Sequence, residues 1–129
     1  MSAVAYVDSS AIVKLVLDEV GSAAMYRWYT ESDRVVTSRV GILETERVAR
    51  RATHDSVHLA AVIRAFEVFE FDADIARRAA LVGPASLRTL DAIHLATALA
   101  VQRVDAFVTY DERLAAAARD LGLPVVRPP

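Results

Sequence analysis

Cysteine is absent from this 129-residue sequence, which excludes disulfide bonds and thiolate metal sites and fits a reducing compartment. Glycine and proline number only four each, too few for a flexible or low-complexity chain. No apolar stretch reaches the roughly 18 residues that a membrane span requires. The N-terminus also lacks the basic start and long apolar core of a signal peptide. These absences predict a soluble, cytoplasmic protein with no membrane partner.

An excess of basic charge is also missing, because 15 basic residues face 17 acidic ones and the net charge is −2. The sequence therefore carries no overall basic footprint for nucleic acid, and any such binding must be local. What is present is apolar: 54% of the residues are hydrophobic. A chain of this length and composition can bury a substantial core, so we expect residues 1–129 to form a single domain.

Strand-like and helix-like segments alternate along the chain. This alternation predicts an α/β fold with a mainly parallel sheet. Strands are expected at 3–7, 34–38, 68–71, 105–110 and 124–127. Helices are expected at 9–21, 22–32, 39–52, 55–66, 72–82, about 88–103 and 111–122, with Gly21 and Gly122 as stops.

Four acidic residues occupy positions in this pattern that can converge. Asp8 and Asp111 follow two predicted strands, and the carboxyl ends of parallel strands are where α/β sheets bind ligands. Asp91 lies near the start of an apolar helix, and such helices start at the same edge. Glu44 lies in mid-helix with Val40 and Val48 on its own face. An acid between two valines requires an explanation.

Each acid also has a structural interpretation. Asp8 and Asp111 can cap the helices that follow them. Asp91 can be a first-turn carboxylate favoured by the helix dipole, and Glu44 can pair with Arg47 or Arg51. A functional cluster would instead require a cation, because like charges about 4 Å apart repel by roughly 4 kcal/mol at an effective dielectric of 20. With oxygen ligands only, Mg²⁺ or Mn²⁺ is the natural occupant.

Four segments carry a family resemblance: "YVDSSAIVKL", "TSRVGILETER", "LDAIHLATAL" and "FVTYDERL", in this order. They resemble the PIN-domain ribonucleases, and the VapC-type toxins of type II toxin–antitoxin systems in particular. The resemblance covers nearly the whole chain and implies a three-layer α/β/α fold. It places the family's four acids on Asp8, Glu44, Asp91 and Asp111. It further implies that Ser9, Ser10 and Thr109 are small polar residues that support the site.

The resemblance implies a metal-dependent endoribonuclease. Hydrolysis of a phosphodiester needs an activated water and relief of the charge on the phosphate, which bound Mg²⁺ or Mn²⁺ provides. We expect Asp8, Asp91 and Asp111 to hold metal while Glu44 positions a second ion or the attacking water. The expected products carry a 5′-phosphate and a 3′-hydroxyl. The number of ions stays open.

RNA would have to be held near this acidic site by local cations. The candidates for phosphate contacts are Lys14, Arg39, Arg47 and Arg113. For any single arginine, a place on a solvated charged surface is the simpler interpretation. His94 follows Asp91 by one helical turn and could tune it, although a buried, hydrogen-bonded histidine is the simpler interpretation.

Three other functions fit parts of the pattern. A phosphoacceptor receiver domain would show an adjacent acidic pair after the first strand, and a dehalogenase-type phosphatase would show Asp-x-Asp there. This chain has Asp8-Ser9-Ser10. A catalytically silent PIN-like module that binds RNA or protein remains the alternative, but all four acids are present.

The toxin resemblance also implies partners. These are an antitoxin of the VapB type that covers the site, and a second copy of the chain in a homodimer. We expect the antitoxin to lay an apolar helix along the early helices and to direct a basic side chain toward the acids.

Overall fold

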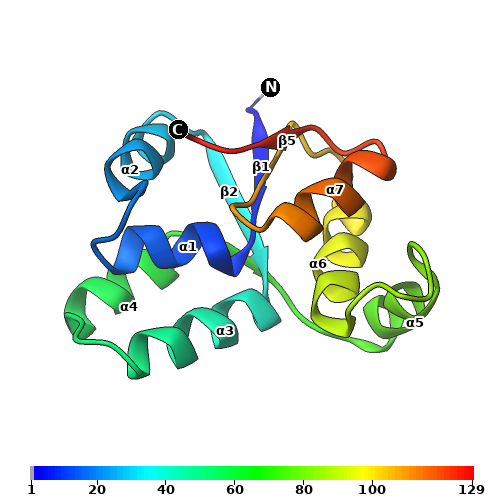
Figure 1. Ribbon diagram of the computed structural model, residues 1–129, viewed down its shortest axis with the longest axis horizontal. Helices are drawn as coiled ribbons and strands as arrows, with labels where there is room; N and C mark the ends of the chain where they lie inside the picture. Colours follow the sequence, from blue (N-terminus) through cyan, green and yellow to red (C-terminus); the bar gives the residue numbers. More distant parts are fainter. Residues whose placement is uncertain (1) are drawn as a thin grey trace.

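The computed structural model describes residues 2–129 and contains one five-stranded parallel sheet with helices on both sides (Figure 1). The strands lie in the order β3-β2-β1-β4-β5, and every neighbouring pair is parallel. They are β1 (Val4–Val7), β2 (Arg34–Ser38), β3 (Glu67–Phe69), β4 (Ala106–Val108) and β5 (Val125–Val126). The helices are α1 (Ser9–Val16), α2 (Ser22–Thr30), α3 (Arg39–Arg50), α4 (Ser56–Arg64), α5 (Ala73–Leu81), α6 (Thr89–Ala100) and α7 (Glu112–Asp120).

The central strands are buried on both faces, and alternate residues supply two separate cores. Ala5 and Val7 point into a cluster with residues of α1, α2, α3 and α4. Val4 and Tyr6 point the opposite way, into a cluster with residues of α6 and α7. This alternation follows from the two-residue repeat of a strand. The result is the three-layer α/β/α fold expected for the chain.

Polar residues start most of the helices. The side chains of Asp8, Ser38, Asp55, Asp72 and Asp111 each accept a hydrogen bond from the first turn of the helix that follows. Such caps satisfy backbone N–H groups that have no partner inside the helix. Because α1, α3 and α7 directly follow strands, their capped ends lie at the carboxyl edge of the sheet (Figure 1).

The expected extent of the first helix is wrong. Helix α1 ends at Val16, not at Gly21, because Leu17 takes an extended conformation. The Ser22 hydroxyl then fixes the connection by donating to the Leu17 carbonyl and accepting from the Glu19 N–H. Gly21, with φ of 91°, precedes α2 as its N-cap. Such a positive φ favours glycine, so its role is to start a helix.

Within the part of the chain that the structure describes, no helix is both long enough and apolar enough to cross a membrane.

The remaining elements agree with expectation to within a few residues at each end. The sheet order places β1 at the centre, between β2 and β4. Residues that follow these three strands are therefore neighbours at one edge.

Candidate active site

Asp8 directly follows the central strand β1 and is 3% exposed. Its Oδ1 accepts hydrogen bonds from the Ser10 hydroxyl (2.7 Å) and the Ala11 N–H (3.1 Å), and its Oδ2 accepts from the Thr109 hydroxyl (2.6 Å). Burial raises the pKa of Asp8, although His94 and these hydrogen bonds act in the opposite direction. The expected capping role of Asp8 is thus real, and it accounts for only one of the three hydrogen bonds.

Two of the three expected supporting residues contact Asp8. Thr109 lies beside it because Val7 of β1 pairs with Val108 of β4. The Thr109 hydroxyl also accepts the N–H of Asp111 (3.0 Å), while Ser10 accepts the N–H of Tyr110 (2.9 Å). Ser10 and Thr109 therefore hold the end of β4 against Asp8. Ser9 makes no side-chain hydrogen bond among residues 2–129.

Glu44 is positioned by a histidine, and not by the arginines considered from the sequence. Its Oε1 lies 2.7 Å from His94 Nε2, and the other ring nitrogen, Nδ1, lies 2.7 Å from the Tyr6 hydroxyl. With the Glu44 oxygen as acceptor, Nε2 is the donor of this hydrogen bond, which leaves Nδ1 to accept from the Tyr6 hydroxyl. Burial raises the pKa of Tyr6 well above its ordinary value, and the charges of Asp8 and Glu44 add to this effect. The phenol therefore stays a neutral donor.

The contact between Glu44 and His94 depends on a close approach of α3 to α6. A Cβ at Gly41 would lie 2.5 Å from Thr37 Oγ1 and 3.3 Å from His94 Cε1. Glycine is required here by space, since its φ is not positive. His94 is buried and hydrogen-bonded, as the simpler interpretation held. Sequence reasoning missed its partner Tyr6, although a tyrosine in a buried strand has to find one.

Asp91 and Asp111 form the second half of the acidic edge. Burial raises the pKa of Asp91, and the negative charge of Asp111 raises it further. The positive charges of His94 and Arg88 act in the opposite direction, and Glu44 adds a smaller raising effect. Asp111 caps α7 through Oδ1 alone, which accepts from the N–H groups of Arg113 and Leu114. Its Oδ2 accepts no hydrogen bond from residues 2–129. These acids thus lie near enough to repel one another.

The donors at this edge suit a hard divalent cation. All four are carboxylates, and no lysine or arginine within residues 2–129 forms an ion pair with any of them. The buried carboxylate of Asp8 therefore has no lysine or arginine partner in this range, and His94 supplies the favourable charge interaction. In the same range no three His, Cys, Asp or Glu side chains converge as a ready metal-binding group. An ion here would take further ligands from water or substrate oxygens, as Mg²⁺ commonly does.

The expected RNA-contacting cations are spread over the surface. Lys14 is engaged by Glu19 and the Val20 carbonyl, and Arg39 forms an ion pair with Glu70. Arg47 is exposed on α3, and Arg113 is exposed in the first turn of α7. Arg113 shares a cavity with Asp91 and with Arg88, a residue that sequence reasoning did not single out. In the sequence, the one indication of a role for Arg88 is its position three residues before Asp91.

Comparison with known proteins identifies the family to which the chain belongs. Residues 5–120 match the PIN domain family. Ribonuclease VapC35 of Mycobacterium tuberculosis is 40% identical over 129 residues, which is 95% of this chain and 96% of that protein. The chain therefore belongs to the PIN-domain family and, within it, to the VapC group.

Solved structures agree in fold. The sarcin-ricin loop cleaving toxin VapC20 of Mycobacterium tuberculosis has a TM-score of 0.72 at 20% identity, covering 88% of this chain and 94% of that one. A toxin–antitoxin complex from Klebsiella pneumoniae gives a TM-score of 0.72 at 24% identity, covering 97% of this chain and 98% of that one. At these identities the similarity establishes the fold alone.

Proposed function

We propose that this chain is a Mg²⁺- or Mn²⁺-dependent endoribonuclease and the toxin of a toxin–antitoxin pair. The observation that carries the proposal is Asp8, a buried carboxylate that forms no ion pair with a lysine or arginine of residues 2–129. It lies at the end of β1, on the edge of the sheet to which we assign Glu44, Asp91 and Asp111. The VapC35 relative, named a ribonuclease, is similar over almost the whole chain. The acidic edge and this relative support the same chemistry independently.

The proposed role of each residue follows from its surroundings. Asp8, Asp91 and Asp111 would hold the divalent ion, directly or through water. When bound, the ion would acidify a water molecule and neutralise charge that builds up on the phosphate. Ser10 and Thr109 fix both oxygens of Asp8, so the carboxylate needs no reorientation.

Glu44 has a different proposed role, because its carboxylate is hydrogen-bonded through one oxygen only among residues 2–129. With Oε1 held by His94, its second oxygen remains available to accept a proton or to orient the attacking water or a second ion. The Tyr6–His94 pair keeps the carboxylate facing the other acids. Hydrolysis by this route leaves a 5′-phosphate and a 3′-hydroxyl on the products.

The test compares cleavage of structured RNA by the wild-type chain and by Asp8→Asn, with Mg²⁺ or Mn²⁺ and with chelator, mapping the product ends. Asp18→Asn serves as the matched control, because Asp18 is an exposed aspartate between α1 and α2. Asp8→Asn should lower the rate by at least about 100-fold, the upper end of what losing an outer partner of a metal costs. Asp18→Asn should cleave normally.

Two results would contradict the proposal. Equal activity of Asp8→Asn and wild type would assign the cleavage to a contaminant. Absence of both cleavage and calorimetric binding of Mn²⁺ by the wild-type chain would favour the silent interaction module. Metal binding that is lost in Asp8→Asn, without cleavage of the RNAs tried, would point to a narrow substrate.

The proposed partners are RNA, a VapB-like antitoxin and a second copy of the chain, in the cytoplasm. One solved relative is described as a toxin–antitoxin complex. Several large apolar side chains are exposed, among them Val20, Tyr26, Val57 and Leu81. Surfaces of this kind mark protein contacts when they are contiguous. Sedimentation equilibrium of the purified chain tests the homodimer, which a monomer at all concentrations would exclude.

A further inference from the structure

A cavity of about 410 Å³ opens beside Asp91. The start of α6, one face of α7 and the loop 83–88 form its walls. Its volume lies within the about 300–1,000 Å³ typical of sites for small ligands. Because Asp91 lines it, the cavity is continuous with the acidic edge that the proposed reaction uses.

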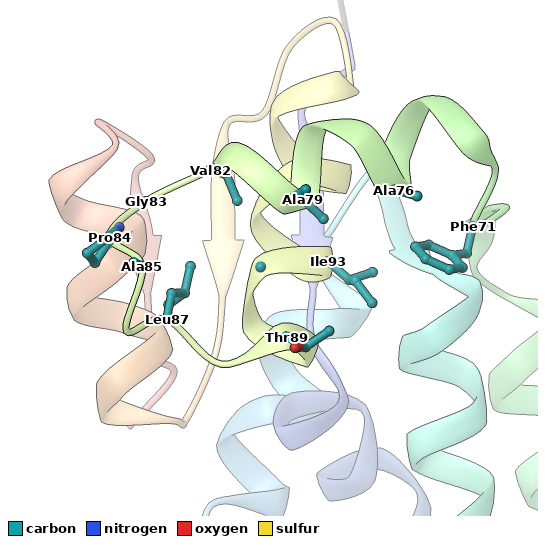
Figure 2. Close-up of a pocket in the computed structure, with 12 residues that line it drawn as sticks. Phe71, Ala76, Ala79, Val82, Gly83, Pro84, Ala85, Leu87, Thr89 and Ile93 are labelled. Carbon is teal, nitrogen blue, oxygen red and sulfur yellow. The ribbon is translucent and has the colours of Figure 1, made fainter.

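The neighbouring cavity has a different character (Figure 2). It measures about 320 Å³, lies between α5 and α6, and has no charged residue in its lining. The loop 83–88 separates the two, and Gly83, Pro84 and Leu87 line both. Of these two neighbouring cavities, the one beside Asp91 combines an apolar wall with charged groups, which is the composition of a specific polar-ligand site.

Two arginines line the charged cavity, and the charge of Arg88 acts on Asp91, which lines the same cavity. Arg88 precedes α6 and Arg113 lies in the first turn of α7. Within the described chain, residues 2–129, neither guanidinium forms an ion pair or a side-chain hydrogen bond. Arg34, Arg39 and Arg127 are by contrast each paired with a glutamate. A free guanidinium presents a fork of donors that matches phosphate oxygens.

The remaining wall suits the rest of a nucleotide. Pro84, Leu87 and Leu121 offer apolar surface, and the carboxylate of Asp120 can accept hydrogen bonds from amino or hydroxyl groups. Two negative groups, Asp91 and Asp120, thus face two positive ones. A bare anion would be poorly served by this balance, whereas a nucleotide carries a phosphate, an apolar base face and donors together.

We propose that this cavity binds one nucleotide of single-stranded RNA next to the scissile phosphate, with Arg88 and Arg113 on its phosphate oxygens. The inference rests on the proposed ribonuclease function and deepens it. It assigns substrate positioning to Arg113, one of the cations considered from the sequence, and to Arg88.

The test measures binding of a fluorescein-labelled, unstructured RNA by anisotropy in the Asp8→Asn background, which prevents cleavage. The parent is compared with the same protein carrying Arg88→Gln and Arg113→Gln. Arg119→Gln is the control for the loss of one positive charge, because it removes that charge from α7 outside the cavity. Thermal unfolding of each variant checks that the fold is retained.

The double variant should bind about tenfold or more weakly, as expected for two lost charge-assisted contacts. Its plot of log affinity against log salt should be shallower by about 1.4, since each phosphate contact on a single strand contributes about 0.7. Arg119→Gln should change neither quantity. In the cleaving protein the double substitution should raise KM more than it lowers kcat.

Three results would overturn the inference: no RNA binding by the parent, equal affinity and salt slope for the double variant, or an equal loss in Arg119→Gln. The two proposals fail separately. Cleavage by the wild-type chain with no effect of the arginines would remove the nucleotide site and leave the ribonuclease. Arginine-dependent RNA binding without metal-dependent cleavage would leave the nucleotide-binding site and remove the ribonuclease function.

Discussion

The Asp8 carboxylate caps a helix and forms part of the acidic edge at the same time. One oxygen accepts the Ala11 N–H and the Ser10 hydroxyl, and the other accepts the Thr109 hydroxyl. Three donors to one buried carboxylate fix its orientation, yet burial still raises its pKa. The carboxylate is therefore already oriented in the metal-free protein, at an electrostatic cost that the proposed divalent cation would offset.

Removing the charge at Asp91 should stabilise the metal-free protein. The folded-state pKa of Asp91 is raised by burial and then by Asp111. The folded state thus binds this proton more tightly than the unfolded state, and the stability it contributes is lost as pH rises through the raised pKa. In chelator, the Tm of Asp91→Asn should exceed that of wild type by an amount that grows from acid toward neutral pH. Equal Tm values across that range would contradict the argument.

Adding Mn²⁺ should raise the Tm of the wild-type protein above that of Asp91→Asn. A ligand that binds only the folded state raises stability in proportion to its occupancy. The Tm of wild type should rise with Mn²⁺ concentration, and that of Asp91→Asn should rise less. Thermal scans at neutral pH over a Mn²⁺ series measure both, and parallel increases would exclude Asp91 as a ligand.

The Thr109 hydroxyl should matter more than its methyl group. Thr109→Val removes the donor to Asp8 and the acceptor of the Asp111 N–H, which should cost about 1–3 kcal/mol of stability. Loss of such an outer partner should lower metal affinity about 10–100-fold. Thr109→Ser keeps both hydrogen bonds and should cost about 1 kcal/mol for the buried methyl. Calorimetric Mn²⁺ titration of both variants tests this, and equal affinities would contradict it.

Secondary structure followed from sequence where local chemistry decides it. Strand β2 has the predicted bounds of residues 34–38, and Asp8, Ser38 and Asp111 cap the helices predicted to follow them. The end of α1 was predicted five residues late, because Ser22 makes hydrogen bonds that compete with another helical turn.

The interior of the site was beyond sequence reasoning. The partner of Glu44 is His94, 50 residues away, and not an arginine on its own helix. That pairing depends on how closely α3 and α6 approach, which is a tertiary property. The four acids were proposed because Asp8, Asp91 and Asp111 follow strands or begin a helix, and because Glu44 lies in mid-helix between two valines. Their supporting groups Tyr6 and His94 look, in sequence, like ordinary core residues.

Gly41→Ala should destabilise the α3–α6 contact. The added Cβ would lie 2.5 Å from Thr37 Oγ1 of β2 and 3.3 Å from His94 Cε1 of α6, so α3 must move away from both elements. Overpacking should cost about 1–3 kcal/mol and outweigh the gain of about 1 kcal/mol from alanine's helix propensity. Leu43→Ala, on the exposed side of α3, is the control and should stay within about 0.5 kcal/mol. Urea unfolding measures both, and a stabilised Gly41→Ala would show that the contact is loose.

At the scale of the whole molecule, charge and apolar surface are separated. Asp8 and Asp111 cap helices at the carboxyl edge of the sheet, while Val20, Tyr26 and Val57 are exposed on the α1–α2 connection, α2 and α4. Figure 1 shows where these elements lie. These early elements pack together around α1. An antitoxin that covers the site can therefore use two different anchors, an apolar helix on the early elements and a cation at the acids.

Charge reversal at Asp91 distinguishes the contribution of the acidic edge to antitoxin binding from that of the apolar surface. If a basic antitoxin side chain contacts the acidic edge, Asp91→Lys should weaken the complex by about 2–5 kcal/mol, because it leaves that cation beside a like charge. Glu46→Lys is the control: Glu46 is exposed on α3, so the same change of net charge should act only through long-range attraction and fade at high salt. Dissociation rates in chelator, measured by surface plasmon resonance with the cognate antitoxin, distinguish them. A contact at Asp91 accelerates dissociation at all salt concentrations, and an unchanged rate would leave the apolar surface as the sole anchor.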